Sequence, residues 1–144
     1  MRKAYLVAGK RTPIGTFMGG LSKTSAVELS AIATKAVLAD LKLDPANIDE
    51  IYLGCVIQAG LGQNPARQVA LASKIPVSVP NTLINKVCAS GMKSLMIGAQ
   101  SLSLGHNNVV LCGGFESMSQ APFLVKGVRS GLTFGNQQFI DSLA

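Results

Sequence analysis

Several residue types are scarce in this chain of 144 residues, and each scarcity excludes a class of site. There is no tryptophan, and there are one histidine and three cysteines. Cys55, Cys88 and Cys112 form no Cys-x-x-Cys pair, and His106 has no partner at metal-ligand spacing, so the sequence predicts no metal site. An odd number of widely spaced cysteines favours a reducing compartment.

Acidic residues are also few, and long apolar runs are absent. Thirteen Lys and Arg against seven Asp and Glu give a net charge of +6, but the basic residues are scattered singly and without interleaved aromatics. No run reaches the roughly 18 apolar residues of a membrane span, and the first residues lack the apolar segment of a signal peptide. We therefore expect no nucleic-acid partner, no membrane span and a cytoplasmic location.

Strand-like and helix-like segments alternate along the chain. Ser25 and Glu28 form a capping box before a helical pattern that reaches Leu41, and Asn64 with Pro65 begins a short helix. Apolar runs predict four strands, at residues 3–8, 48–57, 82–85 and 109–112. This alternation predicts an α/β fold with parallel neighbouring strands and right-handed crossovers.

Cys88 lies between the third strand and a long helical pattern, in the stretch NKVCASGMKS at residues 85–94. A thiol at a strand-to-helix junction faces the positive end of a helix dipole, where the thiolate is favoured. Small residues after it let a substrate approach the backbone. This placement predicts a nucleophile, whereas Cys55 and Cys112, inside apolar strands, are interpreted as inert buried thiols.

Four stretches in order and spacing resemble the thiolases, and within that family the acetyl-CoA C-acetyltransferases (acetoacetyl-CoA thiolases). They are AYLVAGKRTPIGTFMGGLS at residues 4–22, GQNPARQVALASKIP at 62–76, NKVCASGMKS at 85–94 and VVLCGGFESMSQAP at 109–122. The resemblance implies the N-terminal half of the thiolase fold, a βαβαβαβ mixed sheet with helices on both faces.

The resemblance also implies a domain division. Residues 1–119 correspond to the N-terminal α/β domain and residues 120–144 to the beginning of an inserted loop domain, so the chain looks truncated. One face of the helix after Cys88 is expected to pack against the corresponding helix of the missing half. That face consists of small residues, namely Gly91, Ser94, Gly98 and Ser101.

The activity implied by the resemblance is acyl transfer between CoA thioesters. Cys88 would be the acyl-thioester nucleophile, with its backbone N–H in the oxyanion hole, and acyl-CoA and CoA would be the ligands, without a further cofactor. A homodimer or tetramer is expected at full length. The family's activating His, second Cys and water-binding Asn belong to a half that this chain lacks, and His106 is interpreted as a surface turn residue at the far end of the helix.

Three alternatives remain open at this point: a degradative 3-ketoacyl-CoA thiolase, a decarboxylating condensing enzyme of the same superfamily, and a truncated product that acts only as a pairing module.

Other candidate residues carry weaker signals. Glu116 is interpreted as an ion-pair or capping residue rather than a general acid or base, and residues 113–119 lack the lysine of a phosphate-binding loop. Arg67 and Gln68 are expected at the surface or near a subunit boundary.

Overall fold

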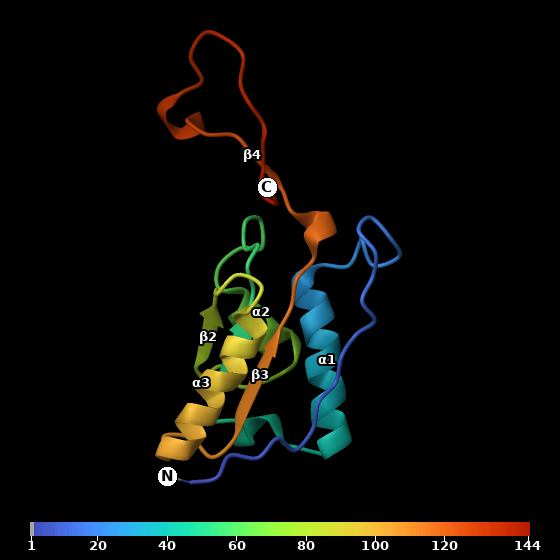
Figure 1. Ribbon diagram of the computed structural model, residues 1–144, viewed down its shortest axis with the longest axis vertical. Coiled ribbons are helices and arrows are strands. Elements are labelled where there is room, and N and C mark those ends of the chain that lie inside the picture. Colours follow the sequence, from blue (N-terminus) through green and yellow to red (C-terminus); the bar gives the residue numbers. More distant parts are fainter. Residues whose placement is uncertain (1) are drawn as a thin grey trace.

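The computed structural model describes residues 2–144 and contains a three-stranded parallel sheet of order β2-β1-β3 (Figure 1). The strands are β1 (Glu50–Gly54), β2 (Asn81–Ile84) and β3 (Val110–Gly114). Gly54 pairs with Ile84 on one side and with Gly114 on the other. The carboxyl ends of all three strands therefore lie at one edge of the sheet, where ligands commonly bind in α/β proteins.

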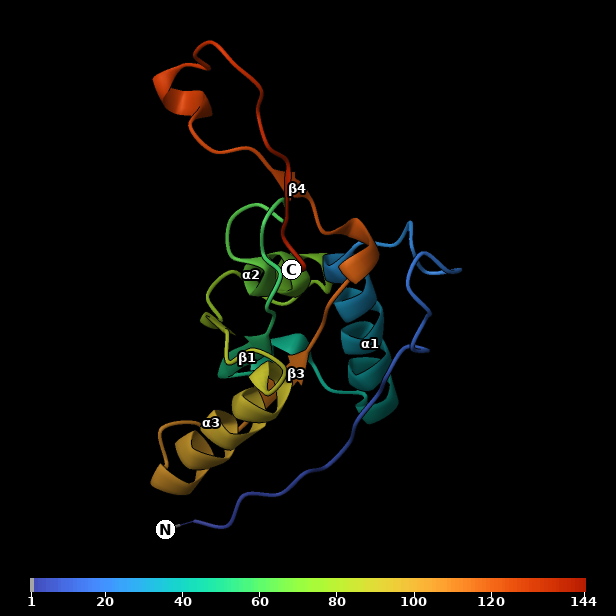
Figure 2. The ribbon, with the colours of Figure 1, turned by 45° about the horizontal axis from the view of Figure 1, so that its top comes forward.

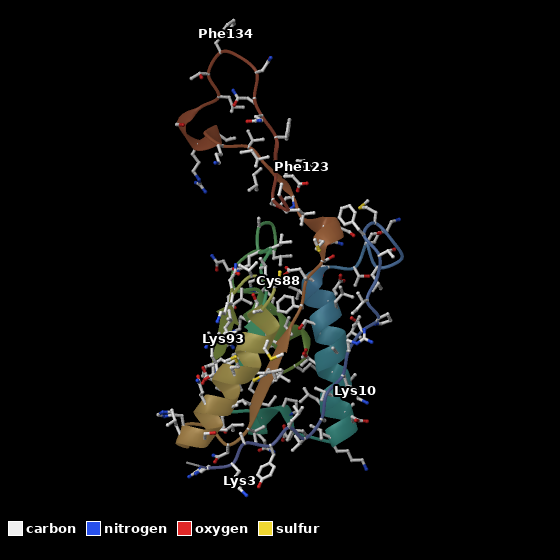
Figure 3. The ribbon with its side chains drawn as sticks, in the orientation of Figure 1. Lys3, Lys10, Cys88, Lys93, Phe123 and Phe134 are labelled. Carbon is white, nitrogen blue, oxygen red and sulfur yellow. The ribbon has the colours of Figure 1, made fainter. Side chains whose placement is uncertain are left out.

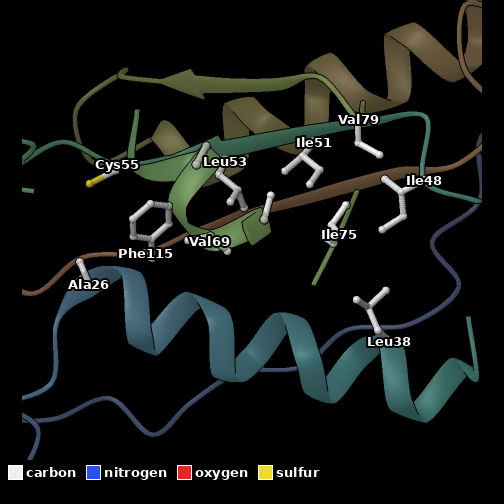
Figure 4. Packing of buried hydrophobic residues seen from close by; sticks show 12 residues of the cluster. Ala26, Leu38, Ile48, Ile51, Leu53, Cys55, Val69, Ile75, Val79 and Phe115 are labelled. Carbon is white, nitrogen blue, oxygen red and sulfur yellow. The ribbon is translucent and has the colours of Figure 1, made fainter. Parts of the chain in front are cut away.

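Helices cover both faces of this sheet, as the α/β prediction requires. On one face lie α1 (Ala26–Leu41) and α2 (Pro65–Ala72), and on the other lies α3 (Ser90–Leu104). Figure 4 shows the core between β1 and the first two helices, in which Ile51 and Val69 are completely buried. Among residues 2–144, no helix has the length and apolarity needed to cross a membrane.

Local capping signals place the helix starts where the sequence predicts them. The Ser25 hydroxyl oxygen accepts the N–H of Glu28, and the Glu28 carboxylate accepts the N–H of Ser25 at 2.8 Å. The Asn64 side chain accepts the N–H of Arg67, and Pro65 occupies the first helical position, where its missing N–H has no cost. Both predicted caps are confirmed.

The strand predicted at residues 3–8 is wrong, because within residues 2–144 no backbone hydrogen bond joins this segment to a neighbouring strand. Leu6 and Val7 are 83% and 76% exposed, and the chain that follows this segment runs beside α1 in Figure 1. A cavity of about 1560 Å³ lies among this segment, α1, α3 and β3, and an ion pair of 3.1 Å joins Lys10 to Asp40 of α1. An apolar run favours extended backbone, but a strand forms only where a neighbour completes its hydrogen bonds.

Beyond the sheet, the chain forms a short antiparallel pair, β4 (Phe123–Leu124) with β5 (Ile140–Asp141). The intervening loop projects away from the sheet in Figures 1 and 2, and Phe134 at its tip points into solvent (Figure 3). The three parallel strands differ from their predicted bounds by a few residues, which is ordinary for element ends.

Candidate functional site

The first turn of α3 packs directly against the ends of β1 and β3 because glycines leave no side chain between them. A Cβ on Gly54 would lie 2.5 Å from the backbone nitrogen of Gly91, and a Cβ on Gly114 would lie 2.9 Å from the Gly91 Cα. These distances are well inside van der Waals contact, so no larger residue fits at either strand end. The glycines thus fix the position of the turn that contains Cys88.

The small-residue face of α3 packs on its own sheet, which corrects the expectation that it meets a helix from another half. Ser94 is completely buried, and its hydroxyl lies 2.8 Å from the Gly113 carbonyl oxygen and 3.1 Å from the Gly113 nitrogen. A Cβ on Gly98 would lie 3.1 Å from the Val110 side chain. Close approach of a helix to a sheet requires small residues, and the apolar stripe that includes Met92, 64% exposed, consequently faces outward.

Cys88 lies in the turn that joins β2 to α3, and this turn has an unusual backbone conformation. Val87 has a φ of +50°, in the left-handed region where a β-branched residue is rare and costs about 1–3 kcal/mol. Hydrogen bonds with Asn85 and Ser90 hold it there. The Val87 N–H donates to Asn85 Oδ1 at 3.0 Å, Ser90 Oγ donates to the Val87 carbonyl at 2.6 Å, and the Lys86 N–H donates to Ser90 Oγ at 2.8 Å.

A cavity of about 320 Å³ opens beside Cys88, at the carboxyl edge of the sheet. Its lining comes from the ends of β1 and β3 and from the turn before α3. The lining residues are Gly54, Val56, Val87, Cys88, Ser90, Gly91, Gly114, Phe115 and Glu116. In Figure 3, Cys88 lies at the N-terminal end of α3. The structure therefore places the predicted nucleophile beside a cavity whose wall includes the closely packed glycines Gly54, Gly91 and Gly114.

The three cysteines differ sharply in accessibility. Cys88 is exposed, Cys55 is buried and Cys112 is half-buried. Burial, together with a hydrogen bond to Glu116, raises the pKa of the Cys55 thiol to about 12, and burial raises the pKa of Cys112 to about 11. Both of these thiols stay protonated near neutral pH, in agreement with their interpretation as inert residues.

Glu116 caps the loop that leaves β1, which agrees with its interpretation as an ion-pair or capping residue. Its Oε2 accepts the N–H of Val56 and its Oε1 accepts the N–H of Ile57, both at 3.0 Å. The Cys55 thiol also donates to Oε1, at 3.2 Å. This carboxylate satisfies backbone donors from a segment 60 residues away, a pairing that no local sequence pattern reveals.

The remaining candidates do not line the Cys88 cavity. His106 is exposed just past the end of α3, and a helix of that length separates it from Cys88 by roughly 20 Å. Arg67 donates to the Val77 carbonyl oxygen and Gln68 to the Gln63 carbonyl oxygen, so both brace nearby loops. Across residues 2–144, no group of three His, Cys, Asp or Glu side chains is placed to hold a metal ion.

Known proteins are similar to this chain in both sequence and structure. The family profile described as the N-terminal domain of thiolase matches residues 4–144. An acetyl-CoA acetyltransferase of Schizosaccharomyces pombe is 43% identical over 98% of this chain and 36% of its own length. The cytosolic acetyl-CoA acetyltransferase ERG10 of Gibberella zeae is 42% identical over 96% of this chain and 35% of its own length.

A solved structure agrees with these relatives. The crystal structure of the Acat5 thiolase from Ascaris suum, in complex with coenzyme A, matches with a TM-score of 0.93 and 42% identity. The match covers 99% of this chain and 37% of that one. The chain thus spans about a third of the length of the curated relatives it matches. By its sequence profile, its relatives and its fold, this chain belongs to the thiolase family, whose N-terminal domain it matches.

Proposed function

We propose that this chain supplies the nucleophile of an acetyl-CoA C-acetyltransferase. The observation that carries the proposal is the contrast between Cys88, exposed beside a cavity at the sheet edge, and two thiols that burial keeps protonated. The names of the similar proteins support the same reaction class. Within the family, this contrast supports an acyl-transferring role over that of a pairing module without catalysis.

The reaction has two covalent steps at Cys88. The Cys88 thiolate attacks the carbonyl carbon of acetyl-CoA, a C–S bond forms, and the CoA thiolate leaves. The α-carbon of a second acetyl-CoA, after loss of a proton to a base, attacks the acetyl-Cys88 carbonyl. A C–C bond then forms, the Cys88 thiolate leaves and acetoacetyl-CoA is released. The reverse direction is thiolysis.

The described residues would contribute unequally to these steps. Cys88 would hold the acyl group, and its backbone N–H would donate to the developing oxyanion. Small residues at the turn leave room for the thioester carbonyl. The Glu116 carboxylate is occupied by backbone donors, and His106 lies at the other end of α3. The base and the second cysteine are therefore proposed to come from parts of the whole protein that the relatives contain and these 144 residues do not.

Further properties of the whole protein belong to the same proposal. Acyl-CoA and CoA would be its ligands without another cofactor, as the coenzyme A complex of the Ascaris suum thiolase supports for that relative. Residues 1–119 would form the N-terminal domain and residues 120–144 the beginning of a loop domain, supported by the projecting β4–β5 segment. A homodimer or tetramer and a cytoplasmic location are proposed, the latter supported by the name of one relative.

Acyl transfer to this chain tests the proposal directly. The folded chain is incubated with acetyl-CoA, and peptide mass spectrometry locates any added acetyl group, with release by hydroxylamine identifying a thioester. We expect the group on Cys88 alone, lost in Cys88→Ser and retained in the matched control Cys112→Ser. Acetylation of Cys55 or Cys112 ahead of Cys88 would show that Cys88 is not the acyl acceptor.

A further inference from the structure

We infer that Glu116 is a positioning residue for Cys88, acting through Val56 and Asn85. This inference rests on the proposed function, in which Cys88 accepts the acyl group. Glu116 itself lines the Cys88 cavity, yet its carboxylate oxygens are engaged by backbone donors rather than free to exchange a proton with a substrate. Its contribution is therefore to geometry, and the contacts that transmit it can be followed from residue to residue.

The first contact fixes the loop that leaves β1. An ionised carboxylate only accepts hydrogen bonds, and Glu116 uses both oxygens, one for the Val56 N–H and one for the Ile57 N–H, at 3.0 Å each. Phe115, the preceding residue, is buried and its N–H donates to the Gly54 carbonyl at 3.0 Å. The carboxylate is thus anchored to the end of the sheet and holds the loop from there.

The second contact joins that loop to the turn before α3. Asn85 Nδ2 donates to the Val56 carbonyl oxygen at 3.4 Å, and Asn85 Oδ1 accepts the N–H of Val87 at 3.0 Å. One side-chain amide therefore connects the residue held by Glu116 to the residue that precedes Cys88. The chain of hydrogen bonds runs from Glu116 to Val56, Asn85 and Val87.

Val87 needs such support because its backbone is in the left-handed region, with a φ of +50°. A β-branched residue leaves that region readily when its hydrogen bonds are removed. A change in the Val87 backbone angles would re-aim Cys88, whose thiol is exposed and not held by packing. Ser90 supports the same turn from the α3 side, so Glu116 and Asn85 supply the support from the β1 side.

The test compares Glu116→Gln with Asp49→Asn. The glutamine has the same shape, but its NH₂ group faces one of the two backbone donors. Asp49 is a matched control, because its Oδ2 also accepts two backbone N–H groups, those of Asn108 at 2.7 Å and Val109 at 2.9 Å, at the opposite end of the sheet. Both changes remove a carboxylate that accepts two backbone N–H groups. Only Glu116 belongs to the chain of hydrogen bonds that leads to Val87, the residue before Cys88.

Two readouts separate positioning from general stability. In Glu116→Gln we expect the limiting rate of Cys88 acetylation to fall about tenfold or more, because small misplacements of reacting groups are costly. The acetyl-CoA concentration that gives half of the limiting rate should stay within about twofold, and both parameters should be unchanged in Asp49→Asn. Amide hydrogen exchange, measured by NMR on folded protein, should speed up at Val87 in Glu116→Gln, although within residues 2–144 no hydrogen bond joins these two residues directly.

Asn85→Asp provides a second variant at an exposed position, in case Glu116→Gln fails to fold. It keeps the acceptor for the Val87 N–H and removes the donor to Val56, so it should reproduce the loss of acetylation. Combined with Glu116→Gln, it should add little, as expected for residues in one network. Unchanged Val87 exchange in both variants would overturn the inference. If the acetyl group is found on Cys55 or Cys112 ahead of Cys88, the proposed function fails, while Val87 exchange still decides the role of Glu116.

Discussion

Replacement of Gly54 by alanine tests whether the end of β1 sets the position of Cys88. A Cβ at this position would lie 2.5 Å from the Gly91 nitrogen and 2.6 Å from the Ser90 carbonyl oxygen. Both are backbone atoms at the start of α3, so no side-chain rotation relieves the overlap. The methyl group has room only if the first turn of α3 moves away from the sheet.

The size of the effect follows from these distances. Ordinary contact begins near 3.4 Å, so the first turn must shift by about 1 Å, and a misplacement of that size can cost about 100-fold in rate. Overpacking of a close-packed site costs about 1–3 kcal/mol of folding free energy. We expect the upper part of that range for Gly54→Ala, because the overlap is with backbone.

Urea unfolding followed by circular dichroism measures the stability change, and acetylation of Cys88 by acetyl-CoA measures the positional one. Gly98→Ala is the matched control, because Gly98 lies in the middle of α3, away from the turn that contains Cys88. A Cβ there would meet the side chains of Val110 and Cys112 on β3. It should lose stability but acetylate normally. Equal acetylation rates in Gly54→Ala and the unmodified chain, or an equal loss in both variants, would refute the reasoning.

Three further outcomes are expected. Iodoacetamide at about pH 8 should label Cys88 first, since burial raises the pKa of Cys55 to about 12 and of Cys112 to about 11. Peptide mapping locates the label, and faster labelling of Cys55 or Cys112 would contradict this expectation. Hydrogen bonds from the Val109 and Asn108 N–H groups lower the pKa of Asp49. Its stabilisation is therefore full above about pH 4 and is lost as pH falls through the lowered value, so Asp49→Asn should flatten the pH dependence of urea unfolding in acid, and an unchanged slope would count against it. The chain should also self-associate through its exposed apolar face on α3 and its exposed N-terminal segment; light scattering after size-exclusion chromatography checks this, and a sharp monomer peak without dye binding would disprove it.

The correction at α3 shows where sequence patterns stop being informative. The stripe of small residues and the stripe of apolar residues on this helix are both visible in the sequence, and periodicity assigns them to opposite faces. It does not say which face meets the sheet. The structure puts Ser94 and Gly98 against β3 and leaves Met92 exposed, because the distance between helix and sheet, not hydrophobicity, decided the orientation.

The amino-acid sequence by itself determined the α/β alternation, the helix starts at Ser25 and Asn64, and the placement of Cys88 between a strand and a helix. Each of these depends on residues a few positions apart, where capping and periodicity act directly. Only the tertiary structure decided that residues 3–8 remain unpaired and that Glu116 holds the loop after β1. Both depend on which distant backbone groups come within hydrogen-bonding reach, and that is fixed by packing of the whole chain rather than by any local pattern.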